Sequence, residues 1–129
     1  VERDADAARR AFVARNVEAV AAVQAFGPAD VLVLLDHDPA MDEVLRVGLA
    51  HGRGFLGALG SRRTQAARRE RLLAAGVPED ALARIHGPVG LDLGARSPAE
   101  TAVSIVAEVL ATRSGRAGSA LRATDNAIH

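Results

Sequence analysis

The residues best suited to chemistry lie in one stretch, Gly57 to Thr64, which reads Gly-Ala-Leu-Gly-Ser-Arg-Arg-Thr. Gly57 and Gly60 allow a sharp turn and a close approach of the backbone to a ligand. Ser61 is placed to cap a helix that begins at Arg62, and the first turn of such a helix presents unpaired N–H groups and the positive end of its dipole. The stretch therefore predicts a site for a phosphate or a similar anion.

Three side chains at the start of this helix add to the prediction. Arg62 and Arg63 supply full positive charges, and Thr64 supplies a hydroxyl. The residues alone leave a plainer interpretation equally open, in which the glycines only make a tight turn and the arginines belong to a solvated helix face.

The elements that must position this stretch alternate between strands and helices. Apolar runs predict strands at Val31–Leu35 and Phe55–Leu59, and the short segment Arg84–His86 before a glycine loop predicts a third. The unbroken run Val31–Leu35 is typical of a strand that is buried on both faces in a parallel sheet. We therefore expect an α/β fold of the Rossmann-like kind, with three layers around a parallel sheet that lacks its first strand or strands.

Four main helices are predicted around these strands. The first ends near Ala25, and its apolar arc comprises Phe12, Val13, Val17, Val20 and Val23. The second begins with Asp38 as cap and Pro39 at its first position, and its apolar face comprises Met41, Val44, Leu45 and Leu49. The third runs from Arg62 to the terminating Gly76, and its arginines are most simply a solvated face: Arg68, Arg69 and Arg71. The fourth begins in a capping box, Ser97 to Glu100, and its apolar face comprises Ala102, Val103, Val106, Val109 and Leu110.

Further candidate binding residues follow the first and third strands. Ligands of parallel α/β sheets lie beyond the carboxyl ends of the strands, where these loops converge with the glycine stretch. The candidates in the two loops are His37, Asp38, His86, Gly87 and Gly90. His37 is suited either to contacting a ligand or to a hydrogen bond with a neighbouring loop. His86 is suited either to lining a ligand or to a structural role in a tight turn, and Asp38 is already explained as a helix cap.

Metal binding and catalysis are not expected. Asp36, His37, Asp38 and His86 offer carboxylates and imidazoles, which suit divalent ions, but structural roles already explain two of the four. No nucleophile with a paired base is evident. We therefore expect a binding module without catalytic residues.

Composition excludes several classes of protein. The 129 residues carry 16 basic and 16 acidic side chains, with three Phe and no Trp or Tyr, which argues against a nucleic-acid surface. The absence of Cys excludes disulfides and thiol chemistry in this chain. No apolar run approaches the ~20 residues of a membrane span, so we expect a soluble, cytoplasmic protein. The first residue is Val1, which suggests a piece of a longer protein.

Three motifs together resemble one family. They read Leu-Leu-Asp-His-Asp-Pro at 34–39, Gly-Ala-Leu-Gly-Ser-Arg-Arg-Thr at 57–64, and Arg-Ile-His-Gly-Pro-Val-Gly-Leu-Asp-Leu-Gly-Ala-Arg-Ser-Pro-Ala-Glu at 84–100. From about Val31 to Ala111 the chain resembles the C-terminal Rossmann-type domain of the xanthine dehydrogenase accessory proteins, the XdhC/CoxI family.

The resemblance implies a maturation factor more than a catalyst. Members of this family are implied to bind the molybdenum cofactor (molybdopterin), protect it during sulfuration and pass it to molybdenum hydroxylases such as xanthine dehydrogenase. A cysteine desulfurase is a further candidate partner. The phosphate of a pterin cofactor suits the anion stretch at Gly57 to Thr64.

Departures from the family pattern leave an alternative open. Within these 129 residues no strand with a Gly-x-Gly turn precedes Val31, no segment resembles the family's N-terminal domain, and Asp36 stands where the pattern is expected to have Thr. The alternative is an NAD(P)-binding, oxidoreductase-like domain. That alternative lacks the Gly-x-Gly-x-x-Gly fingerprint and the acidic residue about 20 positions later.

For domain organisation we expect one Rossmann-like domain over residues 1–113 and a flexible tail over 114–129. The predicted apolar strand and helix faces need more cover than a chain of this length supplies. We therefore expect a homo-oligomer, or a fragment that docks on another domain.

Overall fold

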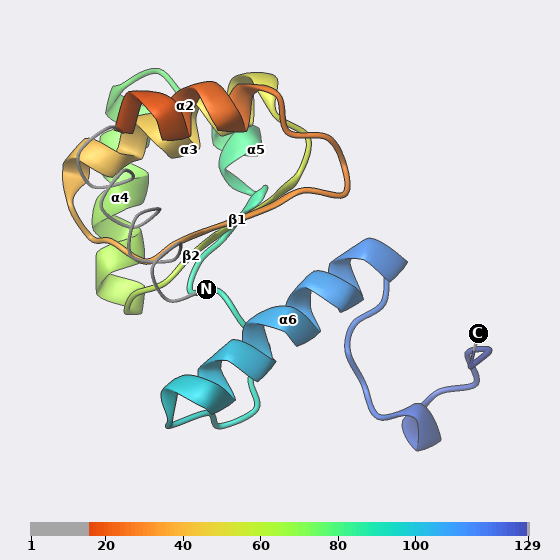
Figure 1. Cartoon of the computed structure of the whole chain (residues 1–129). Coiled ribbons are helices and arrows are strands. Elements are labelled where there is room, and N and C mark those ends of the chain that lie inside the picture. Colours follow the sequence, from red (N-terminus) through yellow and green to blue (C-terminus); the bar gives the residue numbers. More distant parts are fainter. Residues whose placement is uncertain (1–15, 129) are drawn as a thin grey trace, which may run out of the picture. The chain divides into compact units, whose positions relative to one another are not determined.

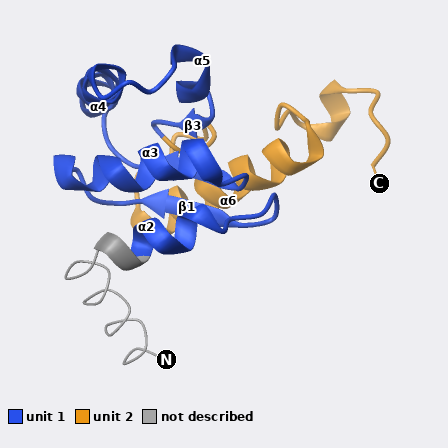
Figure 2. Ribbon diagram, turned by 90° about the horizontal axis from the view of Figure 1, so that it is seen from above, with its two compact units in different colours: residues 1–88 blue, residues 89–129 orange. Residues whose placement is uncertain are grey.

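The computed structural model describes residues 16–128, with side chains from Ala19 onward (Figure 1). The chain divides into two compact units, residues 1–88 and 89–129, and each is described by itself (Figure 2). The predicted apolar residues Phe12, Val13 and Val17 lie outside the described side chains.

The first unit contains a parallel sheet of three strands in the described residues. Its strands are β1 (Val31–Leu34), β2 (Phe55–Ala58) and β3 (Ile85–His86), in the order β1-β2-β3. Val31 lies opposite Phe55, and Leu56 lies opposite Ile85. The predicted α/β fold with a narrow parallel sheet is therefore confirmed.

The prediction that the first strand is buried on both faces is wrong. Val31 is 39% exposed and Leu35, just beyond the strand, is 66% exposed, whereas Leu34 is buried. The reason is position in the sheet, because β1 pairs only with β2 among the described strands. The central strand is β2, all of whose residues are buried.

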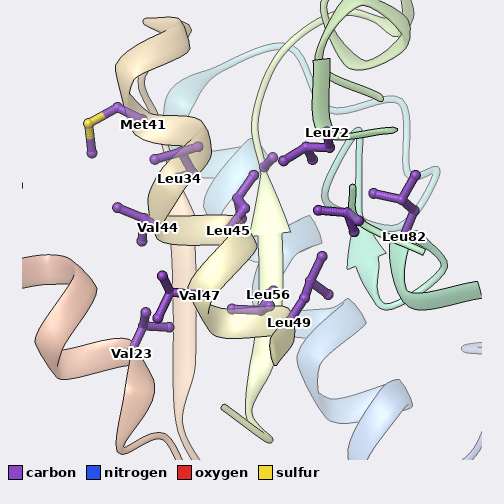
Figure 3. Packing of buried hydrophobic residues seen from close by; sticks show 12 residues of the cluster. Val23, Leu34, Met41, Val44, Leu45, Val47, Leu49, Leu56, Leu72 and Leu82 are labelled. Atoms are coloured by element: carbon purple, nitrogen blue, oxygen red, sulfur yellow. The ribbon is translucent and has the colours of Figure 1, made fainter. Parts of the chain in front are cut away.

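The core of the first unit lies between the sheet and helix α3 (Asp42–His51) (Figure 3). The predicted face of this helix is confirmed, since its apolar residues are all buried: Met41, Val44, Leu45 and Leu49. Val47 joins them, and they pack with Leu34 and Leu56 of the sheet. The core thus fixes one face of β1 and β2 against α3.

Helix α2 (Asn16–Gln24) packs against α3 through Val23, which is fully buried. Gly48 permits this close packing, because a Cβ there would lie 3.0 Å from Val23 Cγ2 and 3.2 Å from the δ-carbons of Leu56. A larger residue at position 48 would therefore push α3 away from both α2 and β2.

Helix α4 (Arg62–Ala74) begins and ends at the predicted residues. Ser61 Oγ accepts a hydrogen bond from Thr64 N at 3.2 Å, as expected of an N-cap. Gly76 has φ +91°, its N–H donates to Leu73 O, and Val77 N–H donates to Leu72 O. These two bonds are the Schellman arrangement, and they explain why glycine stands at position 76. The short helix α5 (Glu79–Leu82) follows directly.

The second unit contains helix α6 (Pro98–Ser114) and a short 3₁₀ helix, η2 (Leu121–Ala123). The capping box is confirmed, because Glu100 N donates to Ser97 Oγ and Ser97 N donates to Glu100 Oε1. The predicted flexibility of the tail after residue 113 stays a prediction.

The predicted apolar face of α6 is wrong in part. Val109 is buried, but three of the other residues are 58–62% exposed: Val103, Val106 and Leu110. Within this unit the preceding segment runs along the polar side of the helix, since Gly90 N donates to Glu108 Oε1 at 2.7 Å and Leu91 N donates to Ser104 O at 3.1 Å. These contacts, rather than the apolar period, determine which side of α6 is covered.

Candidate binding site at the carboxyl edge of the sheet

The loops that follow the three strands meet at one edge of the first unit. The strands are parallel and adjacent, so the loops that start at Leu35, Leu59 and Gly87 leave the sheet on the same side. Leu59 N donates to Leu34 O at 2.8 Å, which extends the pairing of β1 and β2 to their last residues. The sequence prediction that these loops converge is thereby met for the first unit.

Gly60 and His37 lie against one another in this edge. Gly60 has φ +131°, a conformation that favours glycine. A Cβ at this position would lie 3.0 Å from His37 Cε1 and 3.1 Å from Thr64 Cγ2. The glycine therefore both makes the turn into α4 and leaves room for the imidazole of the neighbouring loop.

The first turn of α4 presents charge and unpaired N–H groups. Arg62 and Arg63 are exposed, and no carboxylate of the described residues lies within ion-pair distance of either guanidinium. As the first two residues of the helix, their amides have no partner within the helix. Ser61 Oγ lies 3.2 Å from Thr64 Oγ1, so both hydroxyls sit at the same helix end. This arrangement can receive an anion.

Asp38 is engaged as a cap. Its carboxylate accepts a hydrogen bond from Ala40 N at 3.0 Å at the start of the 3₁₀ helix η1 (Pro39–Met41). Its own amide donates to Asp36 Oδ1 at 2.9 Å. The structural explanation given by the sequence is therefore confirmed, while a direct contact with a ligand stays a prediction.

His86 is placed on the sheet itself. Its ring stacks on Phe55, with centroids 4.3 Å apart and planes 16° from parallel. His86 pairs with Gly57, so both are on the sheet face opposite Leu56 and the core. Gly57 therefore lies within β2 rather than in the loop at the start of α4.

The two remaining candidate binding residues, Gly87 and Gly90, belong to different units of the chain. Gly87 belongs to the first unit and lies against Gln65, since a Cβ at Gly87 would be 2.4 Å from Gln65 Oε1. Gly90 belongs to the second unit, where it has φ +114° and contacts Ser104 and Glu108. The first unit thus brings together candidate residues from three loops, and Gly90 is not one of them because it belongs to the second unit.

The prediction that Arg68, Arg69 and Arg71 form a solvated face is wrong in part. Arg68 is only 2% exposed, and Arg71 Nε donates to Asp42 Oδ2 at 2.6 Å. Arg69 is the most solvated of the three and pairs with the exposed Glu79 at 2.7 Å. The spacing of the inward residues explains the result, because Gln65, Arg68 and Leu72 recur at helical intervals on the face that meets the sheet.

Asp42 is the carboxylate that neighbours both Arg68 and Arg71 of α4. It lies 3.6 Å from Arg68 Nε and binds Arg71 through both oxygens, at 2.6 and 3.1 Å. Burial lowers the pKa of the Arg68 guanidinium, and the Asp42 carboxylate opposes this shift. The hydrogen bond to Asp42 raises the pKa of Arg71. One carboxylate thus serves two cations that join α3 to α4.

A hollow of about 430 Å³ opens beside α4 in the first unit. Apolar residues of α4, α5 and β3 form one part of its lining: Ala66, Leu72, Leu82 and Ile85. The rest of the lining is polar or belongs to the loop after β3: Arg62, Gln65, Arg68, Arg69, Gly87 and Pro88. The hollow therefore continues from Arg62, at the start of α4, to an apolar surface.

The structure describes neither a metal cluster nor a membrane helix. Among residues 16–128, no group of three or more His, Asp or Glu side chains is arranged to hold a metal ion. In the same part of the chain, no helix combines the length and apolarity needed to cross a membrane.

This parallel α/β unit, with a glycine turn at the carboxyl edge of its sheet, defines a protein of the Rossmann class. The family model described as the XdhC Rossmann domain matches residues 2–109. The chain belongs to this family, as the three sequence motifs predicted.

Relatives are longer than this chain. A protein of Bacillus subtilis described as a probable xanthine dehydrogenase subunit is 36% identical over 89 residues, which are 68% of this chain and 25% of that protein. The "Uncharacterized protein YqeB" of Escherichia coli is 37% identical over 79 residues, which are 61% of this chain and 14% of that protein.

A crystal structure described as a xanthine dehydrogenase from Bacillus halodurans is similar in fold, with a TM-score of 0.51 and 33% identity. The match covers 73% of this chain and 26% of that one. The chain thus spans a quarter or less of the curated relatives that it matches.

Proposed function

We propose that this chain is the cofactor-binding part of an accessory factor for a molybdenum hydroxylase of the xanthine dehydrogenase type. The observation that carries the proposal is the start of α4, where Arg62 and Arg63 are exposed and have no acidic partner among the described residues. Membership of the XdhC family and the descriptions of the Bacillus relatives as xanthine dehydrogenases support a hydroxylase of this type as the client enzyme.

The residues at this edge fit a cofactor that carries phosphate. The amides and guanidiniums of Arg62 and Arg63 would hold the phosphate at the positive end of α4. Beside them, the hollow lined by Leu72, Leu82 and Ile85 offers an apolar surface to the ring system of a pterin. His37, against Gly60, would line the same site from the loop after β1.

The molybdenum cofactor, when bound, supplies redox chemistry to its client enzyme. The residues of this chain would bind and orient the cofactor and shield it from water, and the chain would catalyse no reaction by itself. In this proposal a cysteine desulfurase and the hydroxylase are the partners, and all of them meet in the cytoplasm.

A panel of melting temperatures tests the proposal. NAD, NADP, a nucleoside triphosphate and molybdopterin are each added to the 129-residue chain. A ligand at about 100 times its dissociation constant stabilises the folded chain by about 2.7 kcal/mol, which raises the melting temperature by several degrees.

We expect molybdopterin to give the largest shift. The shift should be lost in R62A/R63A and kept in R53A/R122A, which removes two other exposed arginines. A larger shift with NAD or NADP would replace the proposal with the dinucleotide-binding alternative.

A further inference from the structure

Gln65 connects two of the three loops at the carboxyl edge. Its Nε2 donates to Ala58 O at 3.2 Å and to Gly60 O at 3.4 Å, at the end of β2 and in the turn into α4. Its Oε1 faces the loop after β3, since a Cβ at Gly87 would lie 2.4 Å from that oxygen. The side-chain amide therefore fills the space between these loops.

Arg68 connects Gln65 to the third loop. Its Nη1 donates to Gln65 Oε1 at 3.3 Å, and its Nη2 donates to Asp36 O at 3.2 Å. Because Oε1 accepts from the guanidinium, the amide is oriented with Nε2 toward the carbonyls of Ala58 and Gly60. Arg68 is 2% exposed, so water has little access to the guanidinium that orients the amide.

We infer that Gln65 and Arg68 form a brace that positions all three loops of the proposed ligand site. The two residues act through the backbone: Asp36 precedes His37, Gly60 precedes the cap of α4, and Gly87 follows β3. They are positioning residues for the anion site, and this role rests on the proposed function. A side chain at position 87 would displace the Gln65 amide, so the brace favours glycine there.

A double-mutant cycle between positions 65 and 87 tests the brace, with inorganic phosphate as the probe and calorimetry as the readout. Gln65→Ala removes the amide, and Gly87→Ala displaces it by steric contact. Each change should weaken phosphate binding about tenfold, because loosened loops misplace the binding groups. The double variant should bind no more weakly than Gln65→Ala alone, because the added methyl then has nothing to displace.

Matched controls come from the same unit. Gln24→Ala removes an exposed glutamine, and Gly27→Ala adds a methyl to a glycine that also precedes proline, where the nearest atom is Asp30 Oδ2 at 3.7 Å. Both controls should bind phosphate as the unchanged chain does. Losses that multiply in the double variant, or unchanged binding by Gln65→Ala, would overturn the brace.

A measurement without ligand separates the brace from the proposed function. Amide NMR shifts of Gln65→Ala should change together in the loops containing Asp36, Gly60 and Gly87, and stay unchanged at α2. If the unchanged chain does not bind phosphate, the proposed function fails while these shifts still decide the brace. Shifts confined to the neighbours of position 65 along α4 would contradict it.

Discussion

Arg68 is a buried cation that donates hydrogen bonds to the side chain of Gln65 and to the backbone of Asp36 in the loop after β1. Among the described residues, only the Asp42 carboxylate lies within ion-pair distance of it, at 3.6 Å, and that carboxylate binds Arg71 more closely. Burying such a group costs free energy unless hydrogen bonds compensate, and here Asp36 O and Gln65 Oε1 accept them. The residue therefore stabilises the edge of the sheet only as part of this network.

We expect Arg68→Met to destabilise the chain by about 2 to 4 kcal/mol, because two hydrogen bonds from a buried charged donor are lost. Asp42 would stay paired with Arg71 in this variant. Urea denaturation measures the change, with Arg69→Met as control because Arg69 pairs with an exposed carboxylate. Equal stabilities of the two variants would show that the hydrogen bonds of Arg68 do not offset the free energy that its burial costs.

The cap of α4 is a second test at this scale. Ser61→Ala should lower the free energy of unfolding by about 1 kcal/mol, because Thr64 N loses its acceptor. Ser61→Gly should cost only a few tenths of a kcal/mol. Thermal unfolding of both variants provides the comparison, and a larger loss in the glycine variant would argue against the capping bond.

Residue roles that depend on near neighbours could be predicted from the sequence. Ser61 and Asp38 cap helices through amides two or three residues away, which their types and positions indicate. The burial of Arg68 could not, because its acceptor Asp36 O lies 32 positions earlier. Gln65 carried a weak signal, since it shares the inward helical spacing of Arg68 and Leu72.

At the scale of elements, helix ends were better predicted than strand environments. Caps and terminating glycines act locally, so both ends of α4 and the start of α6 agree with the sequence within a residue or two. The second helix was predicted to begin at Asp38 and Pro39, but these residues begin η1, and α3 starts at Asp42. An apolar run does not reveal how many neighbours a strand has, so the run in β1 predicted burial on both faces although β1 lies at the edge of the described sheet.

The end of α3 depends on a residue of the β3 segment. The Arg84 guanidinium donates to Leu49 O at 3.0 Å and to Gly52 O at 2.9 Å, where the last carbonyls of a helix lack partners. Arg84→Met should therefore cost about 1 to 2 kcal/mol, measured by urea denaturation. Arg53→Met, which changes an exposed arginine, is the control, and equal values for the two would contradict the cap.

Helix α6 should respond to acid at its first turn. Hydrogen bonds from the Ser97 and Arg96 amides lower the pKa of Glu100 below its ordinary value of 4.5. A lowered folded pKa stabilises the helix above pH 4.5, and this contribution is lost as the pH falls through the folded pKa. An NMR titration should show the Ser97 amide shifting below pH 4.5, and Glu100→Gln should remove the transition. A transition that persists in Glu100→Gln would contradict this assignment.

At the scale of the whole molecule, the sheet of the described residues has an apolar edge. Val31 on β1 and Leu35 beyond it are exposed, and such an edge favours pairing with another strand. We expect light scattering to give a mass above that of one chain, and Val31→Lys/Leu35→Lys to reduce it to one chain. A monomeric unchanged chain with little dye-accessible apolar surface would contradict the expected association.

The central claim is that the start of α4 holds a phosphate-bearing cofactor. Calorimetry of molybdopterin binding to the unchanged chain, R62A/R63A and R53A/R122A, each at two salt concentrations, tests it most directly. Charge-assisted hydrogen bonds contribute about 1.5 to 3 kcal/mol each, so losing both arginines should weaken binding about a hundredfold or more, with a smaller dependence on salt. The control variant should keep its affinity, and equal affinities of the unchanged chain and R62A/R63A would contradict the claim.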